Sequence, residues 1–179
     1  MIGVRNQRRP VARRTLFAGA AALFALALTS VVDFPTRLVW NASASVPIGL
    51  YAVRPDGRYR PGVIVLAEPP EPLAEFLADG GYLPRGVPLL KRVEAVAGQT
   101  VCRHGFMLTV DGERRAEARE HDRFGRPLPF WSGCREIVEG QLFLLNVDAP
   151  GSLDGRYFGP IPASSIVGRA APLFVRDGR

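Results

Sequence analysis

The chain has 179 residues, 47% of them hydrophobic, which allows one modest domain plus one extra element and excludes a large multidomain assembly. It carries 23 Lys+Arg against 17 Asp+Glu, but five of the arginines lie within residues 1–14, so the remainder is nearly neutral. Binding to a nucleic-acid backbone requires a basic face, and no cluster of Lys or Arg follows the first 14 residues. We therefore expect no nucleic-acid partner.

Residues 15–32 follow this basic tail without a single charged side chain. A helix of that length spans about 27 Å, just short of the ~30 Å hydrocarbon core of a bilayer. Two interpretations are open, a cleavable secretory signal and a retained transmembrane anchor in contact with membrane lipid. The run is longer than the roughly 7 to 15 residues of a signal core and lacks an Ala-x-Ala site before a polar start, which favours the anchor.

The pair Arg13-Arg14 also matches part of a twin-arginine export signal, although that motif is incomplete. The arginines before the apolar run predict, by the positive-inside rule, that the basic tail stays in the cytoplasm. We therefore expect a single-pass protein of the inner membrane: a basic tail over residues 1–14, an anchor over 15–32 and a periplasmic domain over 33–179.

Cys102 and Cys134 are the two cysteines of the chain. In an oxidising compartment such as the periplasm two thiols more often pair than stay free, so we predict a disulfide between them. Zinc is the rival interpretation, but only His104 and His121 are available as further ligands and no Cys-x-x-Cys spacing occurs. We expect neither a metal nor an organic cofactor, and we assign the two histidines to the surface without a role.

The sequence after residue 40 consists of short β-branched or apolar runs separated by Gly and Pro. This pattern is typical of antiparallel strands joined by turns. The predicted strands cover residues 49–53, 63–67, 89–97, 100–103, 107–110, 141–146 and 166–174. The pattern predicts a mainly β fold without internal repeats or a second domain.

One short helix is predicted over residues 72–79, because Pro72 stands in its first turn and Gly80-Gly81 follow its end. The polar stretch 113–133 lacks an apolar period and is predicted as a long surface excursion between strands.

Lys91 is the one lysine among 23 cationic residues, all others being arginine. Arginine stays protonated in proteins, whereas a desolvated lysine can lose its proton near neutral pH and act as a base. The neighbours of Lys91 are Leu89, Leu90 and Val93, an apolar strand that could supply the desolvation. Chance survival of one lysine in an arginine-rich composition is the alternative. A base also needs a hydroxyl to deprotonate, and the chain has only seven serines.

Three segments combine these residues in a recognisable order. They are Ser43-Ala-Ser45-Val-Pro47, Leu90-Lys91-Arg92-Val93, and Ser152-Leu-Asp154-Gly-Arg156-Tyr-Phe-Gly-Pro160. Behind an N-terminal apolar helix, this order resembles the conserved boxes of the serine/lysine signal peptidases, the type I leader peptidase superfamily. The spacing Asn41-x-Ser43-x-Ser45-x-Pro47-x-Gly49-x-Tyr51 is most similar to the conjugative-transfer branch, whose members process pilin precursors.

The resemblance implies a role for each matching residue. Ser45 matches the nucleophile and Lys91 the general base of a Ser/Lys dyad. Ser43 matches the residue whose hydroxyl supports the backbone N–H of Ser45 in the oxyanion hole. Ser152 matches the serine that orients the lysine. Asp154 and Arg156 match a structural pair behind the site, for which a surface salt bridge is the alternative.

The resemblance also implies an antiparallel β signal-peptidase fold and a protein substrate, a precursor with small residues before the scissile bond. Housekeeping leader peptidases carry Ser-Met at the nucleophile and a Gly-Asp-Asn-Arg run where this chain has Ser45-Val46 and Asn146-Val-Asp-Ala149, which favours the transfer branch. Hydrolysis and cyclisation by a substrate amine both stay open. The alternatives are a housekeeping leader peptidase and a non-catalytic anchored β-module of a secretion assembly. A self-cleaving repressor is disfavoured because no DNA-binding domain precedes the β region.

Overall fold

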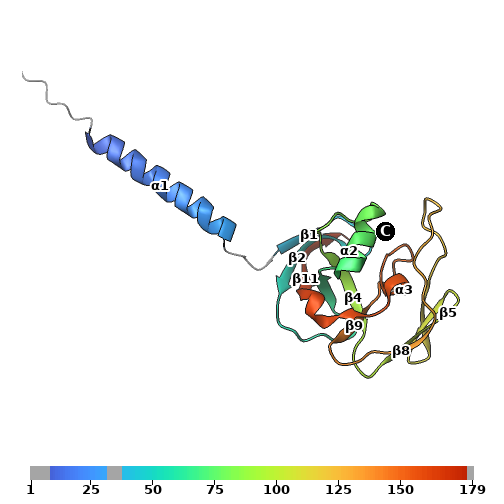
Figure 1. Ribbon diagram of the computed structural model, residues 1–179. Helices are drawn as coiled ribbons and strands as arrows, with labels where there is room; N and C mark the ends of the chain where they lie inside the picture. Colours follow the sequence, from blue (N-terminus) through green and yellow to red (C-terminus); the bar gives the residue numbers. More distant parts are fainter. Residues whose placement is uncertain (1–8, 32–37, 177–179) are drawn as a thin grey trace, which may run out of the picture. The chain divides into compact units, whose positions relative to one another are not determined.

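The computed structural model describes residues 9–31 and 38–176 of the chain (Figure 1). The chain divides into two compact units, residues 1–35 and 36–179. In the first unit the helix α1 (Arg9–Val31) contains the run predicted as an anchor, apart from Val32, which lies outside the described residues. Within the described ranges, no helix combines the length and apolarity that a membrane crossing requires. This finding does not support the predicted transmembrane anchor.

Two antiparallel sheets form the second unit. The larger sheet has the strand order β1 (Leu38–Asn41), β2 (Ile48–Arg54), β11 (Ile166–Arg176), β3 (Ile64–Ala67), β4 (Leu89–Ala95), β9 (Gln141–Leu144), β10 (Ile161–Pro162). The smaller sheet has the order β7 (Glu113–Glu117), β6 (Met107–Val110), β5 (Thr100–His104), β8 (Gly133–Glu136). The prediction of a mainly β fold is therefore confirmed.

Each of the seven predicted strands is present, with ends shifted by a few residues. The four unpredicted strands β1, β10, β7 and β8 are all edges of the two sheets. Edge strands are short and often polar or proline-bearing, so their sequence pattern is weak. The prediction of a surface excursion between strands over residues 113–133 was wrong at its start, because the charged segment Glu113–Glu117 is itself a strand and pairs with β6.

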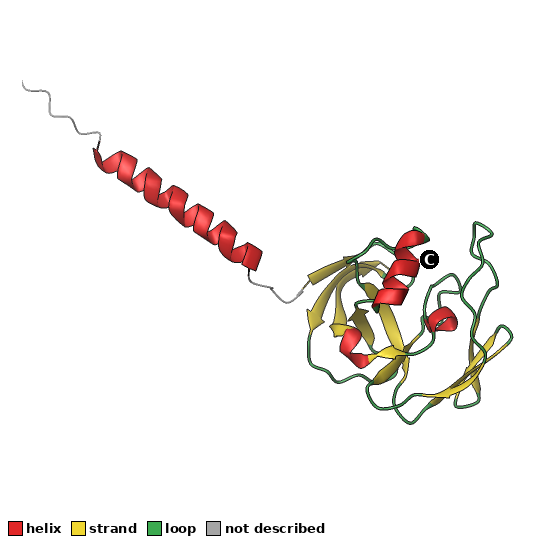
Figure 2. Ribbon diagram, viewed as in Figure 1, coloured by secondary structure: helices red, strands yellow, loops and turns green. Residues whose placement is uncertain are grey.

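Three short helices accompany the sheets (Figure 2). The helix α2 (Glu71–Asp79) confirms the prediction over 72–79 and buries Leu77. The helix α3 (Gly155–Phe158) and the 3₁₀ helix η1 (Ala163–Ser165) were not predicted, because each spans only a single turn. Asp154 caps the N-terminus of α3 through its side chain, which accepts a hydrogen bond from the backbone N–H of Arg156.

The centre of the larger sheet is a dry apolar layer. Val65 on β3 and Val93 on β4 are completely excluded from solvent, and so is Leu144 on β9. In the antiparallel register, Val65 faces Lys91 and Val93 faces Leu144. The strand that carries the only lysine of the chain therefore runs through the core of the sheet.

Cys102 on β5 and Cys134 on β8 are cross-strand partners and form a disulfide with an S–S distance of 2.07 Å. The predicted pairing is confirmed. In the part of the chain that the structure describes, the one group of potential metal ligands is Cys102, His104 and Cys134. Both sulfur atoms of this group are consumed by the disulfide.

Reduction of the disulfide is expected to lower the free energy of unfolding. The two cysteines are 32 residues apart, and the chain-entropy estimate for a loop of that length is about 3.7 kcal/mol. Urea denaturation of the full chain with and without reductant measures the difference, and the Cys102→Ser/Cys134→Ser double variant should match the reduced protein. An unchanged denaturation midpoint after complete reduction would contradict the prediction.

Candidate active site

The turn that carries Ser43 and Ser45 is built on the side chain of Asn41, which is 7% exposed at the end of β1. The Asn41 Nδ2 group donates to the backbone carbonyls of Ser43 (2.7 Å), Val46 (3.1 Å) and Pro47 (3.0 Å). Its Oδ1 accepts from the backbone N–H of Ser43 at 3.1 Å and from the Ser43 hydroxyl at 2.9 Å. One buried amide thus fixes the backbone on both sides of Ser45. Sequence reasoning quoted Asn41 in the motif without assigning it this role.

The hydroxyl oxygens of Ser43 and Ser45 lie 3.1 Å apart and share a hydrogen bond. Because the Ser43 hydroxyl also bonds Asn41, the three side chains form one polar chain that ends at Ser45. The structure therefore brings the two predicted serines together on one rigid turn.

Two further motif residues fix where this turn sits. The hydroxyl of the fully buried Tyr51 donates to the carbonyl of Pro47 at 2.7 Å. Gly49 has φ +149°, and a Cβ at this position would lie 2.0 Å from the carbonyl oxygen of Phe174 on β11. Only glycine allows this approach of β2 to β11, which explains why Gly49 belongs to the motif.

Lys91 lies on β4 and is only 5% exposed. Its Nζ donates a hydrogen bond of 2.8 Å to the Oγ of Ser152, which is also buried. Burial lowers the pKa of Lys91 from 10.5 to about 8; the charge of Asp154 opposes this shift and that of Arg156 assists it. A substantial fraction of the amine is therefore neutral near pH 8.

Asp154 and Arg156 form a fully buried ion pair, 0% and 1% exposed. The Arg156 Nε donates to Asp154 Oδ1 at 3.0 Å, and Arg156 Nη2 donates to Oδ2 at 3.2 Å. The guanidinium also donates to the carbonyls of Asn146 and Ala149, at 2.5 and 3.0 Å. The predicted structural pair is present, and the alternative of a surface salt bridge is wrong.

Asn146 joins this pair to the lysine strand. Its backbone N–H donates to Asp154 Oδ2 at 3.1 Å, and its Oδ1 accepts from the backbone N–H of Arg92, the residue after Lys91, at 2.9 Å. Sequence reasoning noted Asn146 only as a departure from the housekeeping pattern. Its role was not readable, because the contact with Arg92 connects residues 54 positions apart.

Four of the predicted residues, Ser43, Ser45, Lys91 and Ser152, line one cavity of about 690 Å³, here called the larger cavity. Ser45 also lines a neighbouring cavity of about 210 Å³, here called the smaller cavity. Among the described residues the Ser45 hydroxyl bonds Ser43, and the Lys91 amine bonds Ser152, with no hydrogen bond between Ser45 and Lys91. The Ser45 hydroxyl and the Lys91 amine thus line the same cavity, but each is hydrogen-bonded to a different serine.

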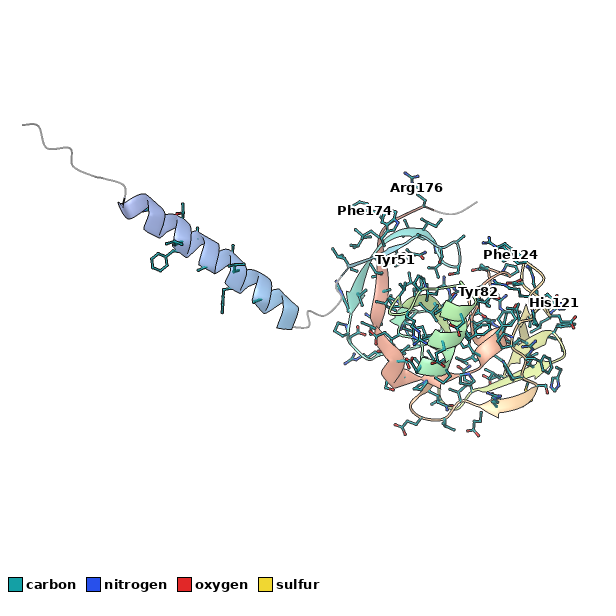
Figure 3. All side chains as sticks on the ribbon, turned by 45° about the horizontal axis from the view of Figure 1, so that its top comes forward. Tyr51, Tyr82, His121, Phe124, Phe174 and Arg176 are labelled. Atoms are coloured by element: carbon teal, nitrogen blue, oxygen red, sulfur yellow. A yellow bond between two sulfur atoms is a disulfide. The ribbon has the colours of Figure 1, made fainter. Side chains whose placement is uncertain are left out.

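Of the other residues named from the sequence, the cysteines lie away from the larger cavity and His121 lines it. Cys102 and Cys134 belong to the smaller sheet and do not line the larger cavity. His121 is solvent-exposed as predicted, but it lines the larger cavity together with Tyr82 and Phe124. Figure 3 shows these three side chains on one side of the second unit, apart from Phe174 and Arg176 near the end of β11.

Comparison with known proteins shows which family the chain belongs to. The family model described as "Signal peptidase, peptidase S26" matches residues 11–175. "Probable conjugal transfer protein TraF" of Sinorhizobium fredii is 39% identical, covering 73% of each chain. "Conjugal transfer protein TraF" of Agrobacterium fabrum is 35% identical over 76% of this chain and 82% of its own. "Plasmid transfer protein TraF" of Escherichia coli is 30% identical over 88% of both chains.

Among solved structures, a signal peptidase I from Enterococcus faecalis V583 is similar, with 20% identity and a TM-score of 0.38. The alignment covers 63% of this chain and 96% of that one. The sequence matches show that the chain belongs to the signal peptidase S26 family, in the branch represented by the conjugal-transfer TraF proteins.

Removal of one partner from the buried ion pair should destabilise the fold strongly. The Asp154→Ala variant leaves the Arg156 charge buried and unpaired, and we expect a loss of about 3 to 5 kcal/mol in the free energy of unfolding. Urea denaturation measures it. The matched control is Asp148→Ala, an exposed aspartate six residues earlier, which should change stability by less than about 0.5 kcal/mol. Equal effects of the two substitutions would contradict the structural role of Asp154.

Proposed function

We propose that the chain is a serine endopeptidase in which Ser45 is the nucleophile and Lys91 the general base. The observation that carries the proposal is the state of Lys91: the only lysine of the chain is 5% exposed, has its pKa lowered to about 8 and opens into the same cavity as Ser45. Burial of a charged amine that is not hydrogen-bonded to a carboxylate costs free energy. Such a lowered pKa is typical of a functional site, where the neutral amine can act as a base.

The first chemical step starts from the hydrogen bonds of Ser45 to Ser43 and of Lys91 to Ser152. Ser45 turns its hydroxyl from Ser43 towards Lys91, and the neutral amine accepts the proton as the Ser45 oxygen attacks the substrate carbonyl. Hydrogen bonds of a catalytic pair are often long or absent before substrate binds and tighten in the complex. Ser152 holds the Lys91 amine at 2.8 Å, so the amine stays fixed while the serine moves.

The negative oxygen of the tetrahedral intermediate is stabilised by the backbone N–H of Ser45 and the hydroxyl of Ser43. Asn41 fixes the backbone of this turn before the reaction begins, and the Ser43 hydroxyl turns from Asn41 Oδ1 to the oxyanion. When the intermediate collapses, the Lys91 ammonium returns its proton to the leaving amine and the acyl group stays on Ser45. Water, or an amine of the substrate itself, then attacks the acyl-enzyme and completes hydrolysis or cyclisation.

The substrate in this proposal is a secreted or membrane-inserted precursor, with a conjugative pilin precursor as the first candidate. Similarity to TraF proteins of conjugal transfer supports this choice. A location at the inner membrane with the catalytic unit in the periplasm is part of the same proposal. It is supported by the uncharged run of residues 15–32 behind five arginines and by the disulfide between Cys102 and Cys134.

The dyad is tested by co-expression with a panel of pilin precursors and one general leader-bearing precursor, with intact-mass spectrometry of the products. Ser45→Ala and Lys91→Arg should each lower processing by about 10³-fold or more, because a guanidinium stays protonated and cannot act as a base. Ser132→Ala, at an exposed serine outside both cavities, is the matched control and should process normally.

The products separate the remaining alternatives. A mature mass lower by one water than the linear product identifies cyclisation. Processing of the general precursor with equal efficiency would indicate a housekeeping leader peptidase. Processing that persists in Lys91→Arg would overturn the dyad, and absence of processing by the wild type of every precursor would favour the non-catalytic module.

The proposal also fixes the direction of the pH dependence. The base acts only when neutral, and burial lowers the pKa of Lys91 to about 8. The value of kcat/KM should therefore rise with pH through about 8 and level off above it. Initial rates on a peptide substrate between pH 6 and pH 10.5 measure the profile. A rise centred near 10.5, the pKa of a solvated lysine, would contradict the role of burial.

A further inference from the structure

One loop that lines the larger cavity is organised by the side chain of Asp122. Asp122 accepts hydrogen bonds from the backbone N–H groups of Phe124 (2.8 Å) and Arg126 (2.9 Å), and its Oδ2 accepts from Arg126 Nε at 2.7 Å. The backbone N–H of Asp122 donates to the carbonyl of Arg126 at 2.9 Å. Residues 119–128, here called the wall loop, are therefore ordered although most of them are exposed.

The same aspartate fastens the wall loop to the end of α2. The Tyr82 hydroxyl donates to Asp122 Oδ2 at 2.8 Å, and the Arg126 guanidinium lies 4.4 Å from the centre of the Tyr82 ring. Arg126 also donates to the carbonyl of Gly80. Burial raises the pKa of Asp122, but these hydrogen bonds outweigh burial and hold its pKa well below the usual range. Asp122 therefore stays ionised, and its negative charge is paired with Arg126 of the same loop.

Arg119 and Arg123 are the two cations of the wall loop that remain available. Both line the larger cavity with Ser45 and Lys91, and both are exposed. In the described part of the chain neither guanidinium forms an ion pair with a carboxylate, and Arg123 rests on the ring of Phe124 at 4.6 Å. The backbone N–H of Arg119 is fixed by the Tyr157 hydroxyl at 3.2 Å. Asp122 is the only carboxylate among the lining residues, and it is already satisfied.

We propose that Arg119 and Arg123 bind a side-chain carboxylate of the substrate, so that the larger cavity selects precursors with Asp or Glu within a few residues of the scissile bond. The inference rests on the proposed function, because the same cavity holds Ser45 and Lys91. A guanidinium recognises a carboxylate through paired N–H donors. The anchored wall loop supplies the fixed geometry that such recognition needs.

Anionic lipid headgroups are the other partner that two arginines beside an exposed phenylalanine could attract. The placement favours the substrate, since both arginines line the cavity that contains Ser45 and Lys91. Lipid binding is therefore treated as an outcome of the test.

The test uses the full-length chain and peptides that span a cleavage site. At each position near the scissile bond, a peptide with Glu is compared with the isosteric Gln peptide by kcat/KM. We expect the wild type to prefer Glu at one or two positions, mainly through KM. Arg119→Gln and Arg123→Gln should each lower that preference, the ratio of kcat/KM for the Glu peptide to kcat/KM for the Gln peptide, about three-fold. The matched control is Arg58→Gln, an exposed arginine outside both cavities.

Tyr82→Phe tests the fixed geometry separately, because it removes one hydrogen bond to Asp122 without changing any charge. It should weaken the preference for Glu without affecting the Gln peptide. The preference in the wild type should also decline as salt is raised from about 0.05 M to 0.5 M, since both arginines are exposed.

Binding of the same peptides to the Ser45→Ala variant, followed by fluorescence anisotropy, separates this inference from the proposed function. Absence of cleavage by the wild type together with tighter binding of the Glu peptide would overturn the peptidase proposal and leave carboxylate recognition standing. Equal cleavage and equal binding of Glu and Gln peptides at every position would overturn the inference alone. Loss of binding to anionic phosphatidylglycerol vesicles by the two arginine variants, with an unchanged preference for Glu, would assign the arginines to lipid and also overturn it.

Discussion

The proposed chemistry of this protein depends on the exclusion of one amine, that of Lys91, from water. Lys91 lies on β4 opposite the fully buried Val65 of β3, and its amine has one side-chain partner, the neutral hydroxyl of Ser152. Desolvation disfavours the ammonium, whereas the nearby carboxylate of Asp154 favours it. Arg156 engages that carboxylate with two hydrogen bonds, so the carboxylate stabilises the ammonium less than an unpaired one would. The buried ion pair therefore has two effects: it fixes the backbone at Asn146, and it weakens the attraction between the Asp154 carboxylate and the Lys91 ammonium.

The turn that carries Ser45, the proposed nucleophile, is held by contacts of a different kind. Ser45 lies on a turn stabilised by local contacts, almost all of which come from one amide, that of Asn41. The lysine side depends on distant contacts, such as that between Arg92 and Asn146. The geometry of the Ser43–Ser45 turn is thus encoded within a few residues, while the position of Lys91 requires the folded sheet. In the proposed mechanism, Ser45 and Lys91 come into direct contact when substrate binds in the larger cavity.

The same distinction explains what could be predicted from the sequence. Central strands, the helix over 72–79 and the disulfide were predictable, because apolar runs, turn residues and cysteine pairing are local or compositional signals. All four edge strands were missed, since pairing with a neighbour rather than residue type defines a strand such as Glu113–Glu117. The order of the motifs gave the candidate site residues. The wall loop was missed because Tyr82 and Asp122 are 40 residues apart, and only the fold brings them together.

In the proposed mechanism, burial lowers the pKa of Lys91 enough for its amine to act as a base near neutral pH. Since the chain contains a single lysine, labelling its lysine with ¹³C at Cε gives one side-chain NMR signal that needs no further assignment. Titration of that signal in the Ser45→Ala variant reports the pKa of Lys91 directly. We expect a midpoint of about 8, because burial lowers the pKa of Lys91. A midpoint near 10.5, as for a lysine in water, would contradict it.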